Sequence, residues 1–357
     1  MKNPTTNNKH NAQSKKNIFS KKRKSVFFSI FVTSIVILFS ACQTSVPVNV
    51  TRPAELDITS AERIAVLPFL TTRMMNYTSY DTNPVATFDY YWREKDSFLA
   101  WQLGDGEGEF VSKLTSSLER ALAKSKYLTL IDSAAVEEAY RYGTPLPIDW
   151  YITGGISNLI TEVNIVEKEV EFKDKEGNRI RIKKPFYEEK VNLSLVYQVV
   201  DVKTREVLAN TEWSYEITSD LEKHKKDLPL PGQLAETKIN DFVKRVMREF
   251  EPYNETYSLT LLKHDDRGMK DAERLARKGN LAQAKTSYLK IYRTTSYFEA
   301  AYNAGLISQA MGNMKEAYKI FSELYKETGD SRAAKAANAA AAEIRSSDKL
   351  NQQTKPR

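Results

Sequence analysis

Residues 191–199 read VNLSLVYQV, and apolar side chains occupy every second position of this stretch. The alternating residues are Val191, Leu193, Leu195, Tyr197 and Val199. Successive side chains of an extended chain point to opposite sides, so these five share one side. The stretch therefore predicts a strand in a sheet that has one buried face.

The sequence on either side of this strand predicts an α/β domain. Further strands are expected at 64–69, 127–131, 149–172 and 207–215. The polar residues 173–178 form the tip of a hairpin that joins the strand at 149–172 to the strand at 191–199. Amphipathic helices are expected at 110–122 and 234–250. The aromatic-rich segment 71–103 is interpreted as an ordered excursion from this domain.

The N-terminus has the pattern of an export signal. A basic stretch ends at Lys24, and the uncharged run SVFFSIFVTSIVILFSA follows from Ser25 to Ala41. The only cysteine, Cys42, stands where this run ends, after Phe39-Ser40-Ala41. That arrangement resembles the bacterial lipobox, in which the cysteine is acylated and the signal is cleaved before it. A signal-anchor helix that happens to end in small residues is the alternative.

The excess of basic residues in the chain is confined to this N-terminal segment. The whole chain has a formal charge of +7. Residues 1–42 hold eight Lys and Arg and no acid, so the remainder carries 45 basic against 46 acidic residues. A basic surface for nucleic acid is therefore not expected. An acylated Cys42 would attach the mature chain to a membrane. Gln43, rather than Asp, follows this cysteine, and the sorting pattern of lipoproteins in enteric bacteria then implies the outer membrane, with the chain facing the periplasm.

The order of motifs in residues 52–250 resembles the curli-secretion lipoprotein (CsgG) family. The motifs are IAVLPF at 64–69, YLTLID at 127–132, DWYITG at 149–154 and VVDVKTREVL at 199–208. Lipoproteins that activate peptidoglycan synthases share the α/β fold of that family. The resemblance implies a mixed α/β sandwich and leaves homo-oligomerisation open. Curli-type members form secretion channels by inserting hairpins, but the hairpin at 166–190 is rich in charge, so a soluble hairpin is expected instead.

The C-terminal third contains an internal repeat. Gly279-Asn280-Leu281-Ala282-Gln283-Ala284 recurs 33 positions later as Gly312-Asn313-Met314-Lys315-Glu316-Ala317. Tyr288 and Phe321 follow at the same offset, and Tyr302 and Gly305 precede the second copy. This pattern resembles the tetratricopeptide (TPR) repeat, which implies paired helices and a groove for protein partners. An unrelated helical hairpin is the alternative.

Together these signals predict an α+β chain in which an all-α repeat domain follows the α/β domain. The expected parts are a signal peptide (1–41), a lipid-anchored tether (42–60), a CsgG-like domain (61–252), a linker (253–265), TPR-like repeats with a capping helix (266–345) and a disordered tail (346–357).

The expected function is a protein-binding scaffold or accessory factor in envelope assembly or secretion, and the partners are other envelope proteins. A curli-type secretion channel is the alternative, and an undetected enzyme is a third. Enzymatic activity, cofactors and metals are not expected, because His10, His224 and His264 share no motif with Ser, Asp or Glu. Residues 104–108 (GDGEG) are interpreted as a turn before an acidic helix N-terminus rather than a phosphate cradle.

Overall fold

The computed structural model describes residues 44–78, 106–173 and 175–355. The expected signal peptide, Cys42 and most of the aromatic segment 71–103 lie outside the described residues. The chain divides into two compact units, one of Thr51–Tyr253 and Ser346–Arg357, the other of Met1–Val50 and Asn254–Arg345. The chain is mixed α and β, as the sequence predicts.

The first unit, here the α/β unit, is built on a five-stranded sheet in the order β3-β2-β4-β5-β6. Its strands are β2 (Arg63–Val66), β3 (Thr129–Leu130), β4 (Trp150–Lys173), β5 (Arg179–Asp201) and β6 (Val207–Thr218). β2 pairs in parallel with β3 and β4, while β4, β5 and β6 pair antiparallel. The sheet is therefore a meander with a short parallel edge.

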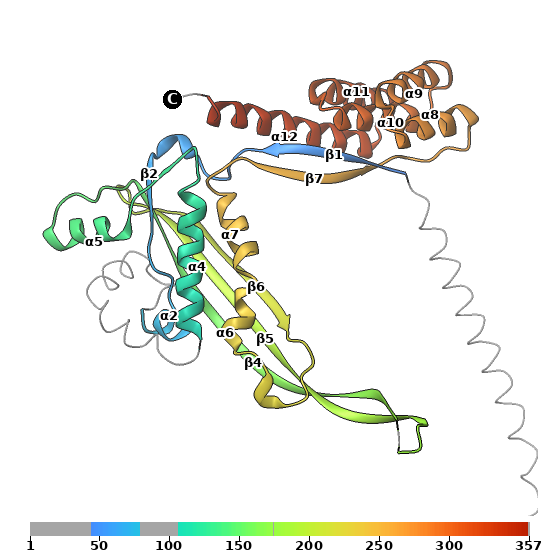
Figure 1. Ribbon diagram of the computed structural model, residues 1–357. Helices are drawn as coiled ribbons and strands as arrows, with labels where there is room; N and C mark the ends of the chain where they lie inside the picture. Colours follow the sequence, from blue (N-terminus) through green and yellow to red (C-terminus); the bar gives the residue numbers. More distant parts are fainter. Residues whose placement is uncertain (1–43, 79–105, 174, 356–357) are drawn as a thin grey trace, which may run out of the picture. The chain divides into compact units, whose positions relative to one another are not determined.

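Helices pack on both faces of this sheet. α4 (Glu107–Leu122) contacts both α6 (Pro231–Glu236) and α7 (Ile239–Met247), and the three helices cover one face (Figure 1). α5 (Ser133–Tyr142) joins a separate core with Tyr151 and Val200, which belong to the opposite side of the strands from Trp150 and Val199. α2 (Thr72–Thr78) contacts β4, and the short 3-10 helices η2 and η3 span Ile58–Ser60 and Lys225–Asp227. The single helix expected at 234–250 is therefore two short helices, α6 and α7.

Aromatic rings form the centre of the main core. The ring of Phe242 on α7 meets the rings of Phe69, Tyr197 and Trp213 edge-on at centroid distances of 5.9, 6.1 and 5.6 Å. A Cβ at Gly154 would lie 2.4 Å from the Val196 carbonyl oxygen and 2.6 Å from the Phe69 ring. Glycine is therefore required at this position of the DWYITG motif, because the Phe69 ring packs directly on the backbone of β4.

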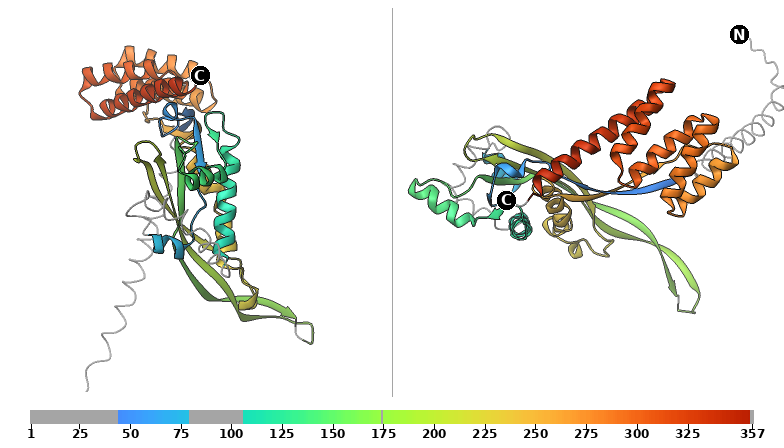
Figure 2. Two further views of the ribbon diagram at one scale, coloured as in Figure 1. Left: turned by 90° about the vertical axis from the view of Figure 1, so that its left-hand side faces the viewer. Right: turned by 90° about the horizontal axis from the view of Figure 1, so that it is seen from above.

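β4 and β5 continue beyond the rest of the sheet as a two-stranded projection (Figures 1 and 2). β2 pairs with β4 only at 150–152, and β6 pairs with β5 only as far as Lys190. Residues 166–173 pair with residues 179–186, from Val166↔Phe186 to Lys173↔Arg179. We name these two segments the arm.

Two segments expected to be irregular are strands. β1 (Ser45–Arg52) lies in the predicted tether, and β7 (Tyr253–Thr260) lies in the predicted linker. The two pair with each other as a two-stranded sheet. Buried Val46 and Val48 alternate with exposed residues in β1, so the tether has a strand pattern that its prolines obscured in the sequence.

The other unit, here the helical unit, contains α8 (Arg267–Arg277), α9 (Leu281–Thr295), α10 (Phe298–Ala310), α11 (Met314–Thr328) and most of α12 (Ser331–Gln353). α8 contacts α9, α9 contacts α10, and α10 contacts α11. α10 is the central helix, with nine buried residues that include Ala304, Gly305 and Ile307.

The prediction that residues 346–357 are disordered is wrong for most of this segment. α12 continues to Gln353, whose side chain is only 5% exposed. The Gln353 amide donates to the carbonyls of Ala54 (3.2 Å) and Leu56 (2.9 Å), and its oxygen accepts from Ala54 N–H (2.8 Å). The polar composition of this segment suggested disorder, but a single buried amide supplies hydrogen bonds that composition does not reveal.

Candidate interaction surfaces

The repeat residues identified in the sequence occupy equivalent places in the helical unit. Gly279 (φ 80°) and Gly312 (φ 78°) adopt left-handed backbone conformations in the turns before α9 and α11. Ala284 on α9 and Ala317 on α11 are both fully buried. The two turns thus start equivalent helices with the same small residue facing the core.

Gly305 on α10 lies directly against the Phe321 ring on α11. A Cβ at Gly305 would lie 2.4 Å from the Phe321 ring, which is fully buried. Tyr302 packs on the same ring at 5.3 Å between centroids, and Tyr288 on α9 is 1% exposed. The aromatic rings therefore fill the space between helices that the small residues open.

A segment of the chain itself covers one side of α10. The Asn303 side chain is fully buried and binds the backbone of Leu262 twice, accepting from its N–H (2.8 Å) and donating to its carbonyl (2.8 Å). Leu259 and Leu261 join the same core, and the His264 ring stacks on Tyr297 at 4.1 Å. The end of β7 and the residues that follow it therefore cover the side of α10 that carries Asn303.

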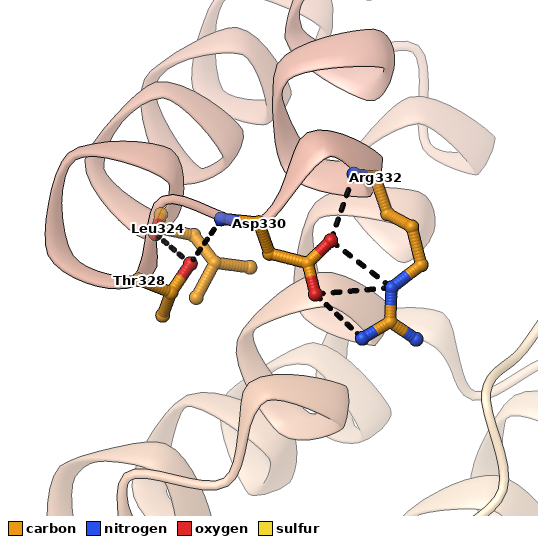
Figure 3. Close-up of polar contacts among 4 residues, drawn as sticks. All are labelled: Leu324, Thr328, Asp330 and Arg332. Atoms are coloured by element: carbon orange, nitrogen blue, oxygen red, sulfur yellow. Dashed lines mark hydrogen bonds and ion pairs between the residues drawn. The ribbon is translucent and has the colours of Figure 1, made fainter.

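The turn between α11 and α12 is held by a chain of polar contacts (Figure 3). Thr328 Oγ1 donates to the Leu324 carbonyl (2.7 Å) and accepts from Asp330 N–H (3.2 Å). The Asp330 carboxylate accepts from Arg332 N–H (2.8 Å) and from its guanidinium (2.7 and 3.1 Å). The hydrogen bonds from Arg332 lower the pKa of Asp330, so the carboxylate stays charged at the start of α12.

The same arginine reaches an aromatic pair on α10. The Arg332 guanidinium lies over the Phe298 ring at 4.3 Å, and Phe298 stacks on Tyr302 at 5.5 Å. These contacts fix the start of α12 against α10. The Asp330–Arg332 pair therefore has a structural role, because it holds the start of α12 against α10.

α11 carries two exposed tyrosines. Tyr318 is 43% exposed and Tyr325 is 47% exposed, and their spacing of seven places them on one stripe of the helix. The buried stripe of α11 is formed by Ala317, Phe321 and Leu324. The tyrosine stripe was missed in the sequence, although the helical spacing of the repeat pattern would have separated it from the buried stripe.

One face of the arm is charged. Glu167 on β4 pairs with Lys183 on β5 at 3.7 Å, and Glu171 lies 3.5 Å from Arg181 and 3.8 Å from Arg179. These pairs are exposed, so they balance charge without adding much stability.

The opposite face of the arm is apolar. Val166, Val170 and Phe172 on β4 lie opposite Phe186, Ile182 and Ile180 on β5. Phe172 is 50% exposed and Ile180 is 39% exposed. This face was not visible in the sequence, where the valines of β4 alternate with acids, because the register with β5 decides which side chains share a side.

Residues suited to catalysis or metal binding are dispersed in the parts of the chain that the structure describes. No group of three or more His, Asp, Glu or Cys side chains there is arranged to hold a metal ion. His264 Nδ1 accepts from Asp266 N–H (3.1 Å) near the start of α8. Glu107, from the predicted acidic turn, accepts from Thr72 N–H (2.9 Å) and its hydroxyl. Within residues 44–78, 106–173 and 175–355, no helix has the length and hydropathy needed to cross a membrane.

No protein-family model matches the chain, and no curated protein matches it. Among solved structures, the chain is similar to the protein CT253 from Chlamydia trachomatis, at 15% identity over 53% of this chain and 96% of that one, with a TM-score of 0.25. It is similar to the PelC dodecamer from Paraburkholderia phytofirmans, at 8% identity over 59% and 99%, with a TM-score of 0.24. A neuraminyllactose-binding hemagglutinin homolog from Helicobacter pylori matches at 10% identity over 56% and 87%, with a TM-score of 0.28. Similarities at this level carry no argument about function.

Proposed function

We propose that this chain is a lipoprotein of the bacterial envelope that binds protein partners as a scaffold or accessory factor in assembly or secretion. The repeated helix pairs of the helical unit carry the proposal. Residues of the chain itself fill the space between these helices, but Tyr318 and Tyr325 on α11 remain exposed to solvent. Exposed tyrosines are frequent anchors of protein interfaces, because they combine apolar area with a hydrogen-bonding hydroxyl.

The proposal moves the partner site away from the groove that the TPR resemblance implies. Asn303 on α10 is already satisfied by Leu262, and Leu259 and Leu261 pack beside it. A partner at that position would have to displace this segment and break two partly buried hydrogen bonds. The tyrosine stripe on α11 requires no such displacement.

The partner site is tested by changing Tyr318 and Tyr325 together to Ala. We expect the variant to keep its fold and to recover less of the partners that crosslinked envelopes yield with the parent chain. Tyr142→Ala is the matched control, since Tyr142 is a 72% exposed tyrosine on α5. Equal recovery with both variants would place the site elsewhere.

The anchor at Cys42 is part of the same proposal. The thiol ends the apolar run after small residues, and two acyl chains are sufficient for stable attachment to a bilayer. We expect Cys42→Ala to abolish incorporation of labelled palmitate and to leave an uncleaved precursor, because the acceptor thiol is lost. Continued labelling of this variant would contradict a lipoprotein.

The curli-type channel is less well supported. The paired strands β4 and β5 are long, and the arm has an apolar face. However, Lys168 and Lys184 lie directly opposite each other in the middle of that face. A lysine facing lipid at the bilayer midplane costs about 2–4 kcal/mol, so insertion across the membrane would meet this penalty twice in each subunit. We therefore retain a protein-binding scaffold or accessory factor as the proposed function.

A further inference from the structure

The arm combines features that the scaffold does not explain. From Val166 to Phe172 and from Ile180 to Phe186, its apolar face contains six apolar side chains, two lysines and no acid. The acids of the same segments, Glu167, Glu169 and Glu171, all belong to the opposite face. The arm is therefore amphipathic, and its apolar side is also cationic.

The two lysines contact rings rather than carboxylates. Lys168 Nζ lies over the Phe186 ring at 6.0 Å, and Lys184 Nζ lies over the Phe172 ring at 5.9 Å. Among the described residues, no carboxylate forms an ion pair with either ammonium group. Both charges thus remain uncompensated beside exposed aromatic and aliphatic groups.

We propose that the apolar face of the arm lies on the surface of an anionic lipid bilayer. An exposed apolar stripe that contains two lysines favours the interface, because the apolar groups enter the headgroup region while the long lysine side chains carry their ammonium groups to the lipid phosphates. The charged face then stays in water, where its cross-strand pairs already balance their charges.

Charge selects lipid over a second copy of the chain. If the apolar faces of two arms packed together about a two-fold axis, four lysines would gather in one desolvated interface without a carboxylate. An anionic bilayer supplies the missing negative charge and needs no matching surface. The inference concerns the α/β unit alone and does not depend on the proposed partner site on α11.

The test places a probe on each face of the arm in the full-length chain. With Cys42 changed to Ser, Val170→Cys gives a single thiol on the apolar face, and Glu169→Cys gives one on the charged face. A fluorescent dye is attached to the thiol of each variant. The labelled protein is then bound to vesicles of phosphatidylcholine and phosphatidylglycerol whose acyl chains carry a quencher. The N-terminal apolar run is common to both variants, so it holds them at the membrane equally.

We expect quenching at position 170 and little at position 169. Reversing both lysines (Lys168→Glu with Lys184→Glu) should reduce the quenching at 170 more than about five-fold, the factor that one lysine contributes at an anionic surface. Lys183→Glu on the charged face should leave it unchanged, and circular dichroism should show the same melting temperature for all variants. Equal quenching of both faces would overturn the proposal. A dye at position 170 that is protected from water even without phosphatidylglycerol, and that loses this protection when the protein is diluted, would also overturn it. Such a result would indicate that a second copy of the chain covers the apolar face.

Discussion

At the scale of single residues, Gly305 and Phe321 show how the repeat pattern specifies a contact. Only glycine lets the Phe321 ring approach the backbone of α10, since an added Cβ would lie 2.4 Å from the ring. Glycine inside a helix is unfavourable by about 1 kcal/mol relative to alanine, so its presence in α10 is explained by packing rather than by helix propensity. The 33-residue offset aligns Phe321 with Tyr288 in the sequence, whereas the contact of Phe321 with Gly305 is seen in the structure.

Changing Gly305 to Ala tests this balance. The gain in helix propensity is about 1 kcal/mol, whereas overpacking a closed core costs about 1–3 kcal/mol. We expect a net loss of up to about 2 kcal/mol in the free energy of unfolding of the helical unit, measured in urea. Phe321→Leu removes the ring, so the double variant should be destabilised by less than the sum of the single changes. A more stable Gly305→Ala variant would show that the close contact is absent.

At the scale of elements, the register between β4 and β5 determines which of their side chains share a face, and the sequence alone does not give this register. Read alone, β4 shows valines alternating with acids, which favours a charged hairpin. Paired with β5, the same valines share a face with Ile180, Ile182 and Phe186. Register depends on the turn at 175–178 and on the bulge between Ile156 and Asn158, and periodicity alone specifies neither. The hairpin was therefore predictable, whereas its apolar face was not.

The last turns of α12 give a second test at this scale. Gln353→Ala would leave the N–H and carbonyl of Ala54 and the carbonyl of Leu56 without their partners. Unsatisfied buried groups cost about 1–3 kcal/mol, so we expect the α/β unit to lose stability by this order. Hydrogen exchange should show earlier opening at the amide of Ala54.

Gln352 is the matched control, because it belongs to the same helix and is exposed. Gln352→Ala should leave both the free energy of unfolding and the exchange at Ala54 unchanged. If Gln353→Ala behaved like this control, the end of α12 would not be docked on residues 54–56, and the tail predicted from composition would be correct.

At the scale of the whole molecule, the chain joins an α/β unit to a helical unit, and each has its own core. The different periodicities of the sheet and the helix pairs predicted an α/β domain at 61–252 and helical repeats at 266–345. The two compact units differ from these bounds, because each is formed by two separate stretches of the chain. β1 and β7 were not predicted, since their pairing joins residues about two hundred positions apart. The proposed site on α11 also depends on the structure, because the groove implied by the TPR resemblance was rejected only after Asn303 was found hydrogen-bonded to Leu262.

The central claim is that partners bind the tyrosine stripe of α11. Lys319 and Lys326 each follow one of the two tyrosines, so amine-reactive crosslinking of the chain in intact envelopes reports directly on this surface. Mass spectrometry of the crosslinked peptides should find partner peptides attached mainly to these two lysines, and the Tyr318→Ala, Tyr325→Ala variant should lose them. Partner crosslinks that instead cluster on lysines of the α/β unit, and that persist in this variant, would contradict the account.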